Sequence, residues 1–183
     1  QIKQFTDICS KMTHKLGYRP IRHILNSAGI ERFPDAHFDM VRLGIGLHGI
    51  SVVSKKLKAA GTLKTKICQI KSISASDTVG YNRRGTLTRD SVIGIIPIGY
   101  ADGLDRKLGN RKGQVLVGGK RAPFVGDICM DMSMIDITGI EAREGDVVII
   151  FGEKHTIREL AQQVGTIPYE ILTNVSTRVK RVY

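Results

Sequence analysis

Three carboxylates interrupt an apolar stretch in the second half of the chain, where residues 128–137 are rich in Ile and Met. They are Asp127, Asp131 and Asp136. A carboxylate inside an apolar strand costs free energy unless a hydrogen bond or an opposite charge compensates it. The simpler interpretation is a half-exposed strand whose side chains alternate between two faces. The alternative is a strand that presents a polar site.

Three other side chains suit binding or proton transfer, and each also has a plain structural explanation. Arg42 lies in the apolar segment MVRLGIGL, where an arginine either reaches solvent from a strand end or meets a partner inside. Ser27 follows the short apolar segment 21–25, and Ser is common in turns. Tyr81 lies in the turn VGYN, where an exposed tyrosine is common. Taken alone, these residues favour the structural explanation.

The elements that must position these residues fall into two groups. Up to about residue 50, helical and strand-like patterns alternate, which is typical of an α/β fold. An apolar stripe at helical spacing predicts an amphipathic helix that ends at Gly17. The predicted elements of this part are a helix over 2–16, strands over 21–25 and 40–47, a turn over 26–29 and a short helix over 33–38.

The pattern changes near Ile50 to short strands separated by Gly-rich turns, which is typical of a small antiparallel β-domain. One helix interrupts it. Thr156 and Glu159 have the spacing of a capping box, and Gly165 ends the apolar face that follows. The predicted strands cover residues 64–73, 95–98, 114–117, 122–125, 128–137 and 147–151.

The formal charge of +11 at pH 7 calls for a compensating partner. Nucleic acid is one candidate, which would make the chain a basic, non-catalytic β-domain. Aromatic residues are only 5% and Trp is absent, so few side chains could stack on bases. Acidic chain outside this sequence is another candidate. The main basic run comprises Lys55, Lys56, Lys58, Lys64, Lys66 and Lys71.

The cysteines and the hydropathy pattern limit the location and the class of the protein. Cys9, Cys68 and Cys129 are odd in number and lack CxxC spacing, so we expect a reduced, cytoplasmic chain without a structural metal. The sequence has no run of 18 apolar residues, so no spanning helix is predicted.

Four ordered blocks resemble the alanine racemase family. IPIGYADG followed by RAPFVGDICMDM resembles its C-terminal domain, GTIPYEILTNVSTRVKRVY its terminal segment, and FDMVRLGIGLHG the close of its barrel. GLDRKLGN is similar to the racemase half of bifunctional proteins that also carry a muropeptide D-Ala-D-Ala ligase domain. The resemblance implies that residues 1–50 form the last βα units of a TIM-type (β/α)8 barrel that binds pyridoxal 5'-phosphate (PLP). Residues 51–183 would then be the mainly antiparallel β-domain with one helix.

The resemblance also implies an activity, which is the interconversion of L-alanine and D-alanine for peptidoglycan precursors. In the family two protomers pair head to tail, so we expect a homodimer that acts on alanine, with neither nucleic acid nor a membrane as a partner. The lysine that binds PLP covalently lies on the family's first barrel strand, and no lysine here occupies that motif. We therefore expect residues 1–183 alone to be inactive.

Residue roles follow from the resemblance, position by position. Tyr81 matches the second acid–base residue, which acts opposite that lysine and is supplied to the partner's barrel. Met130 matches a position whose backbone N–H binds the substrate carboxylate. The residues implied to hold PLP are Arg42 at the pyridine nitrogen and Ser27, Gly44, Ile45 and Tyr169 at the phosphate. Those implied to line the substrate entrance are Tyr100, Arg106 and Ile167.

The chain departs from the family pattern at several positions. Leu43 stands where Pro is usual, His48 where Tyr is usual and Asn82 where Gly is usual. At the entrance, Asp127 replaces an Arg that many members carry. Exchanging a cation for an anion would alter the steering of a charged substrate.

Overall fold

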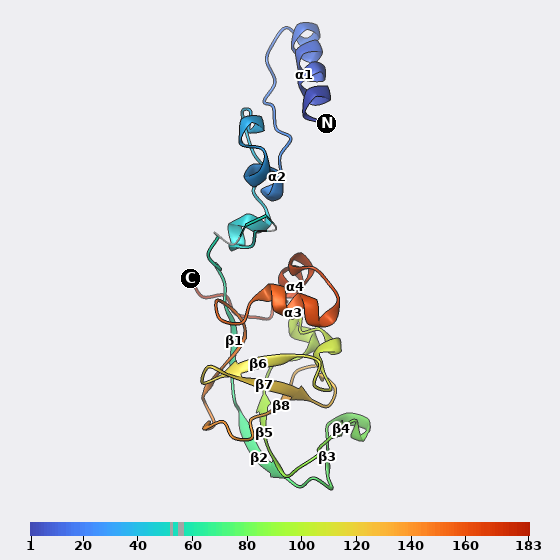
Figure 1. Cartoon of the computed structure of the whole chain (residues 1–183), viewed down its shortest axis with the longest axis vertical. Helices are drawn as coiled ribbons and strands as arrows, with labels where there is room; N and C mark the ends of the chain where they lie inside the picture. Colours follow the sequence, from blue (N-terminus) through green and yellow to red (C-terminus); the bar gives the residue numbers. More distant parts are fainter. Residues whose placement is uncertain (52, 55–56) are drawn as a thin grey trace. The chain divides into compact units, whose positions relative to one another are not determined.

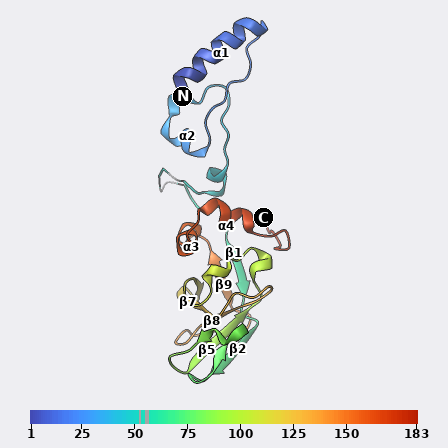
Figure 2. The ribbon, with the colours of Figure 1, turned by 90° about the vertical axis from the view of Figure 1, so that its right-hand side faces the viewer.

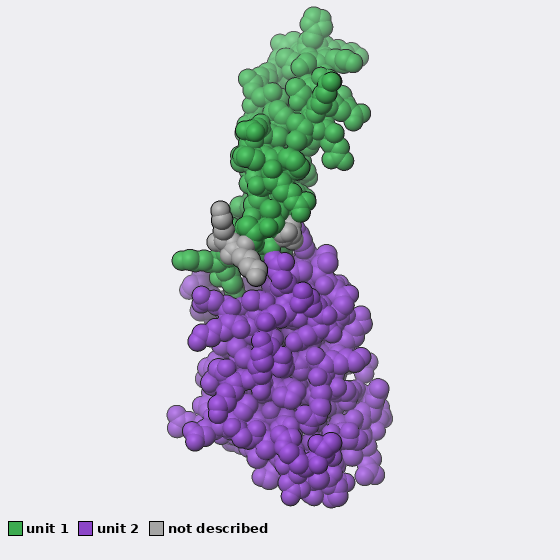
Figure 3. Space-filling model, in the orientation of Figure 1, with its two compact units in different colours: residues 1–61 green, residues 62–183 purple. Residues whose placement is uncertain are grey.

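A computed structural model describes residues 1–51, 53–54 and 57–183 (Figure 1). Two lysines of the basic run, Lys55 and Lys56, lie outside the described residues, as does Val52. The chain forms two compact units, residues 1–61 and residues 62–183 (Figure 3). Within the described ranges, every helix is too short or too polar to cross a bilayer.

The described part of the first unit contains two α-helices, and their ends follow local sequence signals. The predicted helix is confirmed as α1 (Ile2–Leu16), and Gly17 ends it with φ 74° and an N–H that donates to the Thr13 carbonyl. No residue of α1 is buried. Asn26 caps α2 (Ser27–Arg32) by accepting from Gly29 N–H, where the sequence predicted only a turn.

Other predictions for this unit are wrong in detail. Residues 21–25 and 40–47 do not form strands, although they lie close enough for Arg42 N–H to donate to the Leu25 carbonyl at 3.0 Å. A parallel strand gains its ladder from neighbours on both sides, and these two segments share too few bonds for one. The predicted short helix over 33–38 is a 3₁₀ turn, η1 (Pro34–Ala36), and a second one, η2 (Ile45–His48), follows Gly44.

The second unit is built on a curled antiparallel sheet of seven strands with the order β1-β9-β6-β7-β8-β5-β2. A separate hairpin pairs β3 with β4. The α-helices α3 and α4 lie side by side at one end of the sheet (Figures 1 and 2). The strands are β1 (Leu63–Lys66), β2 (Gln69–Ile73), β3 (Thr78–Val79), β4 (Gly85–Thr86), β5 (Ser91–Ile96), β6 (Gln114–Val117), β7 (Lys120–Val125), β8 (Ser133–Asp136) and β9 (Val147–Phe151).

The strand predicted over 64–73 is divided in the structure. Ile67 N–H donates to the Asp146 carbonyl beside β9, whereas Cys68 N–H donates to the Ile95 carbonyl on β5. The chain therefore changes partner strand between two successive residues. β1 and β2 are the two edge strands of the sheet, and they follow one another in the chain. The change of partner therefore joins one edge of the sheet directly to the other, and the sheet must curl to allow this.

The strand predicted over 128–137 is also shorter than expected, because only β8 (Ser133–Asp136) pairs with β5 and β7. The carbonyls of Cys129 and Met130 instead accept the N–H groups of Tyr100 and Ala101. Backbone groups that serve a neighbouring turn are not available to a ladder. The core inside the sheet includes Ile96, Leu108, Val115, Phe124, Ile135 and Val148, all fully buried.

The helix predicted after Thr156 is confirmed as α3 (Ile157–Val164). Thr156 Oγ1 accepts from Glu159 N–H, and the Glu159 carboxylate accepts from Thr156 N–H. Gly165 ends the helix at φ 73°. The pattern did not predict α4 (Pro168–Asn174), a short helix. It begins with a proline, a residue that is favoured at the first position of a helix.

Candidate functional site

Tyr81 opens a 3₁₀ turn, η3 (Tyr81–Arg83), between the two strands of the small hairpin. The turn is unusual because Asn82 and Arg83 both have φ 56° and Gly80 has φ 81°. A Cβ at Gly80 would lie 3.0 Å from the Met134 methyl, so the backbone approaches the sheet closely there. The Tyr81 side chain is 72% exposed and projects from the hairpin.

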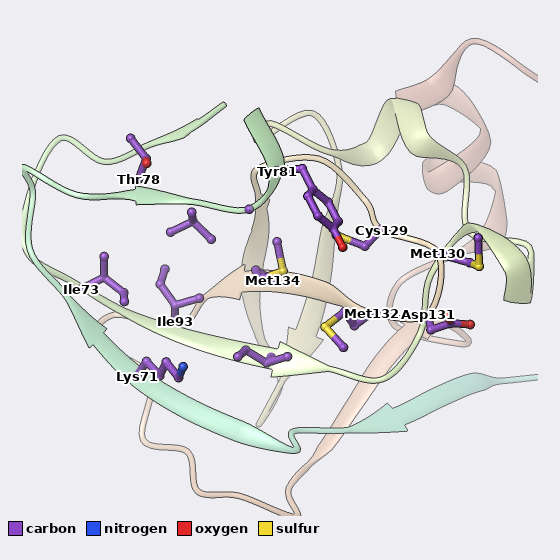
Figure 4. A pocket seen from close by; sticks show the side chains of 13 residues that line it. Lys71, Ile73, Thr78, Tyr81, Ile93, Cys129, Met130, Asp131, Met132 and Met134 are labelled. Carbon is purple, nitrogen blue, oxygen red and sulfur yellow. The ribbon is translucent and has the colours of Figure 1, made fainter. Parts of the chain in front are cut away.

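A pocket of about 520 Å³ lies beneath this turn. In Figure 4, the Tyr81 ring points from its turn towards the segment that bears Cys129 and Met134. Burial raises the pKa of the Cys129 thiol, and the nearby Asp127 charge adds to that effect. The lining is mostly apolar and comprises Lys71, Ile73, Thr78, Val79, Gly80, Tyr81, Ile93, Ile95, Cys129, Met130, Asp131, Met132 and Met134.

Met130 brings a backbone donor to the same pocket. Its carbonyl accepts from Ala101 N–H at 3.0 Å, but its own N–H has no acceptor within residues 1–51, 53–54 and 57–183. An unpaired N–H at the wall of a pocket suits an anionic ligand atom. The arrangement thus combines a phenol hydroxyl with a free amide donor over an apolar floor.

Two residues predicted at the entrance are held next to the Met130 segment. Tyr100 lies in the 3₁₀ turn η4 (Tyr100–Asp102), and its N–H donates to the Cys129 carbonyl at 3.0 Å. Arg106, in η5 (Arg106–Leu108), places its guanidinium carbon 5.9 Å from the centroid of the Tyr100 ring. Tyr81, Met130, Tyr100 and Arg106 therefore belong to one continuous set of turns.

The three carboxylates noted in the sequence are all paired. Asp127 accepts from Asn110 and Arg84, and Asp131 accepts from Arg178. Asp136 is 4% exposed and faces Arg89, Arg111 and Thr138. Burial raises the pKa of Asp136, but hydrogen bonds from Thr138 and the two arginines outweigh it and lower the pKa overall. The predicted half-exposed strand with alternating faces is wrong, because every residue of β8 is buried.

Arg178 is a residue of this region that the sequence placed in a C-terminal basic run with Lys180 and Arg181 but did not assign to the site. Its guanidinium contacts Asp131 at 2.7 Å and Asp102 at 3.3 Å, and the bond to Asp131 raises its pKa. It thereby ties the C-terminal segment to the turn after Tyr100 and to the residue after Met130. The only sequence signal was the uncompensated charge of Asp131 in an apolar run.

The first unit contains three of the four residues predicted to bind a phosphate. The Ser27 hydroxyl is buried and accepts from Gly44 N–H at 2.9 Å and Gly46 N–H at 3.2 Å. Gly44 N–H is thus already bonded, whereas Ile45 N–H has no acceptor among the described residues. The Ser27 hydroxyl hydrogen also lacks an acceptor there, which leaves two donors for an anion.

Arg42 lies beside a cavity of about 640 Å³ in the same unit, which Ile24, Asn26 and Arg32 also line. Its guanidinium donates to the Ile24 carbonyl at 3.1 Å. Tyr169 and Ile167 belong to the second unit, at the start of α4, and are 38% and 59% exposed. Ser27 and Arg42 belong to the other unit.

Family models cover nearly all of the chain. Residues 60–183 match "Alanine racemase, C-terminal domain" and residues 1–52 match "Alanine racemase, N-terminal domain". Alanine racemase from Thermodesulfovibrio yellowstonii is 42% identical over 188 residues, covering 100% of this chain and 50% of the relative. Alanine racemase 1 from Clostridium acetobutylicum is 41% identical over 194 residues, with the same coverage.

Solved structures agree with these relatives. Alanine racemase from Streptomyces coelicolor A3(2) superposes with a TM-score of 0.90 at 34% identity, covering 100% of this chain and 50% of that one. The Clostridium difficile 630 enzyme, in complex with cycloserine, gives 0.85 at 38% identity, covering 93% and 47%. This chain spans about half the length of the curated relatives it matches. It belongs to the alanine racemase family.

Proposed function

We propose that the chain is the C-terminal part of a PLP-dependent alanine racemase and supplies one wall of its active site. The observation that carries the proposal is the pocket that both Tyr81 and Met130 line, the latter with a backbone N–H that has no acceptor among the described residues. A racemase must remove and return a proton on both faces of one carbon, so it needs acid–base groups on opposite sides. Tyr81 is the group that this chain contributes.

The chain's own residues divide the work at the substrate. The Met130 N–H binds the alanine carboxylate and thereby orients the Cα–H bond, and the Tyr81 oxygen takes or returns the proton on one face. The apolar side chains of the pocket exclude water, which strengthens the polar contacts that remain. Tyr100, Arg106 and Ile167 line the path by which the amino acid enters.

The first unit supplies groups for the cofactor. PLP, when bound, withdraws electrons from the amino acid and makes its Cα proton acidic. Its phosphate suits the donors at Ser27 and Ile45, with Gly44 leaving room beside the Ser27 hydroxyl, 3.8 Å from where a Cβ would stand. Arg42 is assigned to the pyridine nitrogen, and its guanidinium cannot give up a proton to that ring. Tyr169 is assigned to the phosphate on the family pattern.

The assembly follows the family. Two protomers pair head to tail, and the Tyr81 of one serves the barrel of the other, with the PLP lysine on chain that precedes this sequence. The product D-alanine enters peptidoglycan precursors in the cytoplasm, and a ligase domain lies upstream, as GLDRKLGN suggests. The domain division between residues 50 and 51 also stays a prediction. Neither the fold nor the comparisons favour the nucleic-acid alternative.

The test is Tyr81→Phe in the longer polypeptide, which keeps the ring and removes only the oxygen that carries the proton. We expect racemisation to fall by about 10³–10⁴-fold, the upper range for a general acid–base group, while PLP stays bound. Exchange of the Cα hydrogen with solvent deuterium should survive better for D-alanine, whose hydrogen faces the lysine, than for L-alanine. Near-normal activity, or equal exchange of both enantiomers, would mean that Tyr81 is not the base.

A further inference from the structure

The turn that carries Tyr81 presses against a short backbone segment, Gly126–Asp127. Gly126 has φ 70°, and a Cβ there would lie 2.7 Å from the Val79 carbonyl oxygen. A Cβ at Gly85 would lie 2.9 Å from Gly126 Cα. Both strands of the small hairpin therefore touch this segment backbone to backbone, and Asp127 is the first residue there whose side chain can reach the turn.

The Asp127 carboxylate joins two turns of the proposed site. It accepts from Arg84 Nη1 at 3.4 Å, and Arg84 directly follows the Tyr81–Arg83 turn. Its other oxygen accepts from Asn110 Nδ2 at 2.6 Å, and Asn110 follows the turn that carries Arg106. The Asp127 side chain is only 13% exposed, so these contacts are partly shielded from water.

The two turns differ in how firmly the backbone holds them. Asn110 N–H donates to the Gly126 carbonyl at 2.8 Å, and a Cβ at Gly109 would lie 2.7 Å from that oxygen, so the Asn110 side is packed tightly. The Tyr81 side is open, because Tyr81 is 72% exposed and the Arg84 side chain 62% exposed. Both sides contain two successive non-glycine residues in left-handed conformations, Asn82 and Arg83 on one side and Asn110 and Arg111 on the other, and such conformations need outside contacts to persist.

We infer that Asp127 is a positioning residue that fixes the orientation of the Tyr81 turn through Arg84, using the tightly packed Asn110 side as its anchor. The inference rests on the proposed role of Tyr81. By resemblance, many family members place an arginine here at the entrance. In this chain the position holds an anion, Asp127, which binds the chain's own turns. A charge that would steer the substrate is therefore replaced by one that positions the turn of the acid–base residue.

The test compares Asp127→Arg and Arg84→Glu in the full-length dimer. Asp127→Arg replaces an acceptor of two charge-assisted contacts by a cation, and we expect racemisation to fall about tenfold, with KM changing less than twofold. Arg84→Glu should cost about three- to fivefold, as an exposed ion pair does. In both variants, exchange of the L-alanine Cα hydrogen with solvent should slow together with racemisation. Exchange of the D-alanine Cα hydrogen, which lies on the opposite face, should not slow.

The matched control is Arg83→Glu, the same charge change one residue earlier. Its guanidinium donates to Thr78 Oγ1, so we expect less than a twofold effect. A readout independent of catalysis is amide hydrogen exchange over residues 80–85, which should accelerate in Asp127→Arg and Arg84→Glu but not in Arg83→Glu. Equal amide exchange over residues 80–85 in all three variants would overturn the inference that Asp127 holds the Tyr81 turn through Arg84.

Combination with Tyr81→Phe separates this inference from the proposed function. If Asp127 acts through Tyr81, Asp127→Arg should cause no further loss in the Tyr81→Phe background. Losses that multiply would overturn the inference while leaving Tyr81 as the base. If Tyr81→Phe alone keeps its activity, the proposed function fails, and the amide exchange still decides whether Asp127 holds the turn.

Discussion

Gly99 is the position where a single methyl group should disturb the site most directly. A Cβ at Gly99 would lie 2.3 Å from the carbonyl oxygens of both Cys129 and Met130, whereas real Cβ atoms keep at least 3.0 Å. Both obstacles are backbone atoms, so no side chain can rotate away. Gly99→Ala must therefore push the Tyr100 turn and the Met130 segment apart by about 0.7 Å, the difference between these two distances.

The size of the effect follows from what the separation breaks. Tyr100 N–H and Ala101 N–H donate to those same carbonyls at 3.0 Å, and both bonds would lengthen. Overpacking of this kind costs about 1–3 kcal/mol of folding stability. A displacement of about 1 Å at a substrate-positioning group costs up to about 100-fold in rate. We expect kcat/KM for alanine to fall by about 10- to 100-fold.

The assay pairs urea unfolding with initial rates of racemisation in the full-length protein, and Gly61→Ala serves as the control. Gly99 has φ −145°, a conformation that alanine adopts freely, so its backbone is not strained by the change. A Cβ at Gly61 meets nothing within 4 Å, so that variant should behave like the wild type. If Gly99→Ala matches Gly61→Ala in both stability and kcat/KM, the close approach is not a constraint on the site.

Two further substitutions test the charges around the site. Arg178→Met removes the link between Asp102 and Asp131. We expect little loss of folding stability, because the ion pairs are exposed, but a severalfold higher KM. An unchanged KM would contradict a role for Arg178 in placing Met130. The lowered pKa of Asp136 means that its contribution is present above the unfolded value of about 4 and is lost as the pH falls through the folded pKa. The urea midpoint of the wild type should therefore drop more steeply than that of Asp136→Asn between about pH 5 and pH 2, and parallel profiles would refute the assignment.

Elements set by local chemistry were predictable from the sequence. α1 ends before Gly17 and α3 begins after Thr156, because the caps that fix these ends lie within one turn of the helix. The division of the 64–73 strand was not predictable, because it depends on distant partners: Ile67 N–H donates to the carbonyl of residue 146, and Cys68 N–H to that of residue 95. The strands predicted over 21–25 and 40–47 fail for the same reason, because a ladder depends on neighbours and not on the apolar pattern.

The candidate site shows the same limit. The sequence drew attention to Asp127, Asp131 and Asp136, but their arginine partners lie up to 47 residues away and carry no local signal. Tyr81 lies in an ordinary-looking turn, and only the family resemblance assigned it a role. The pocket beneath it forms where Met130 and its neighbours leave the sheet and hydrogen-bond to the Tyr100 turn. The alternation of apolar and polar residues in the sequence does not predict such a departure.

The curl of the seven-stranded sheet has a consequence for synthesis of the protein. Leu63, at the start of β1, pairs with Phe151, at the end of β9, so the first strand of the domain to leave the ribosome must wait for the last. Contacts this far apart in sequence form slowly, because a long loop must close before they contribute. Until then β1 has an unpaired edge that a chaperone or a neighbouring nascent chain can bind. The domain should therefore complete its folding only after β9, which ends at Phe151, has been translated.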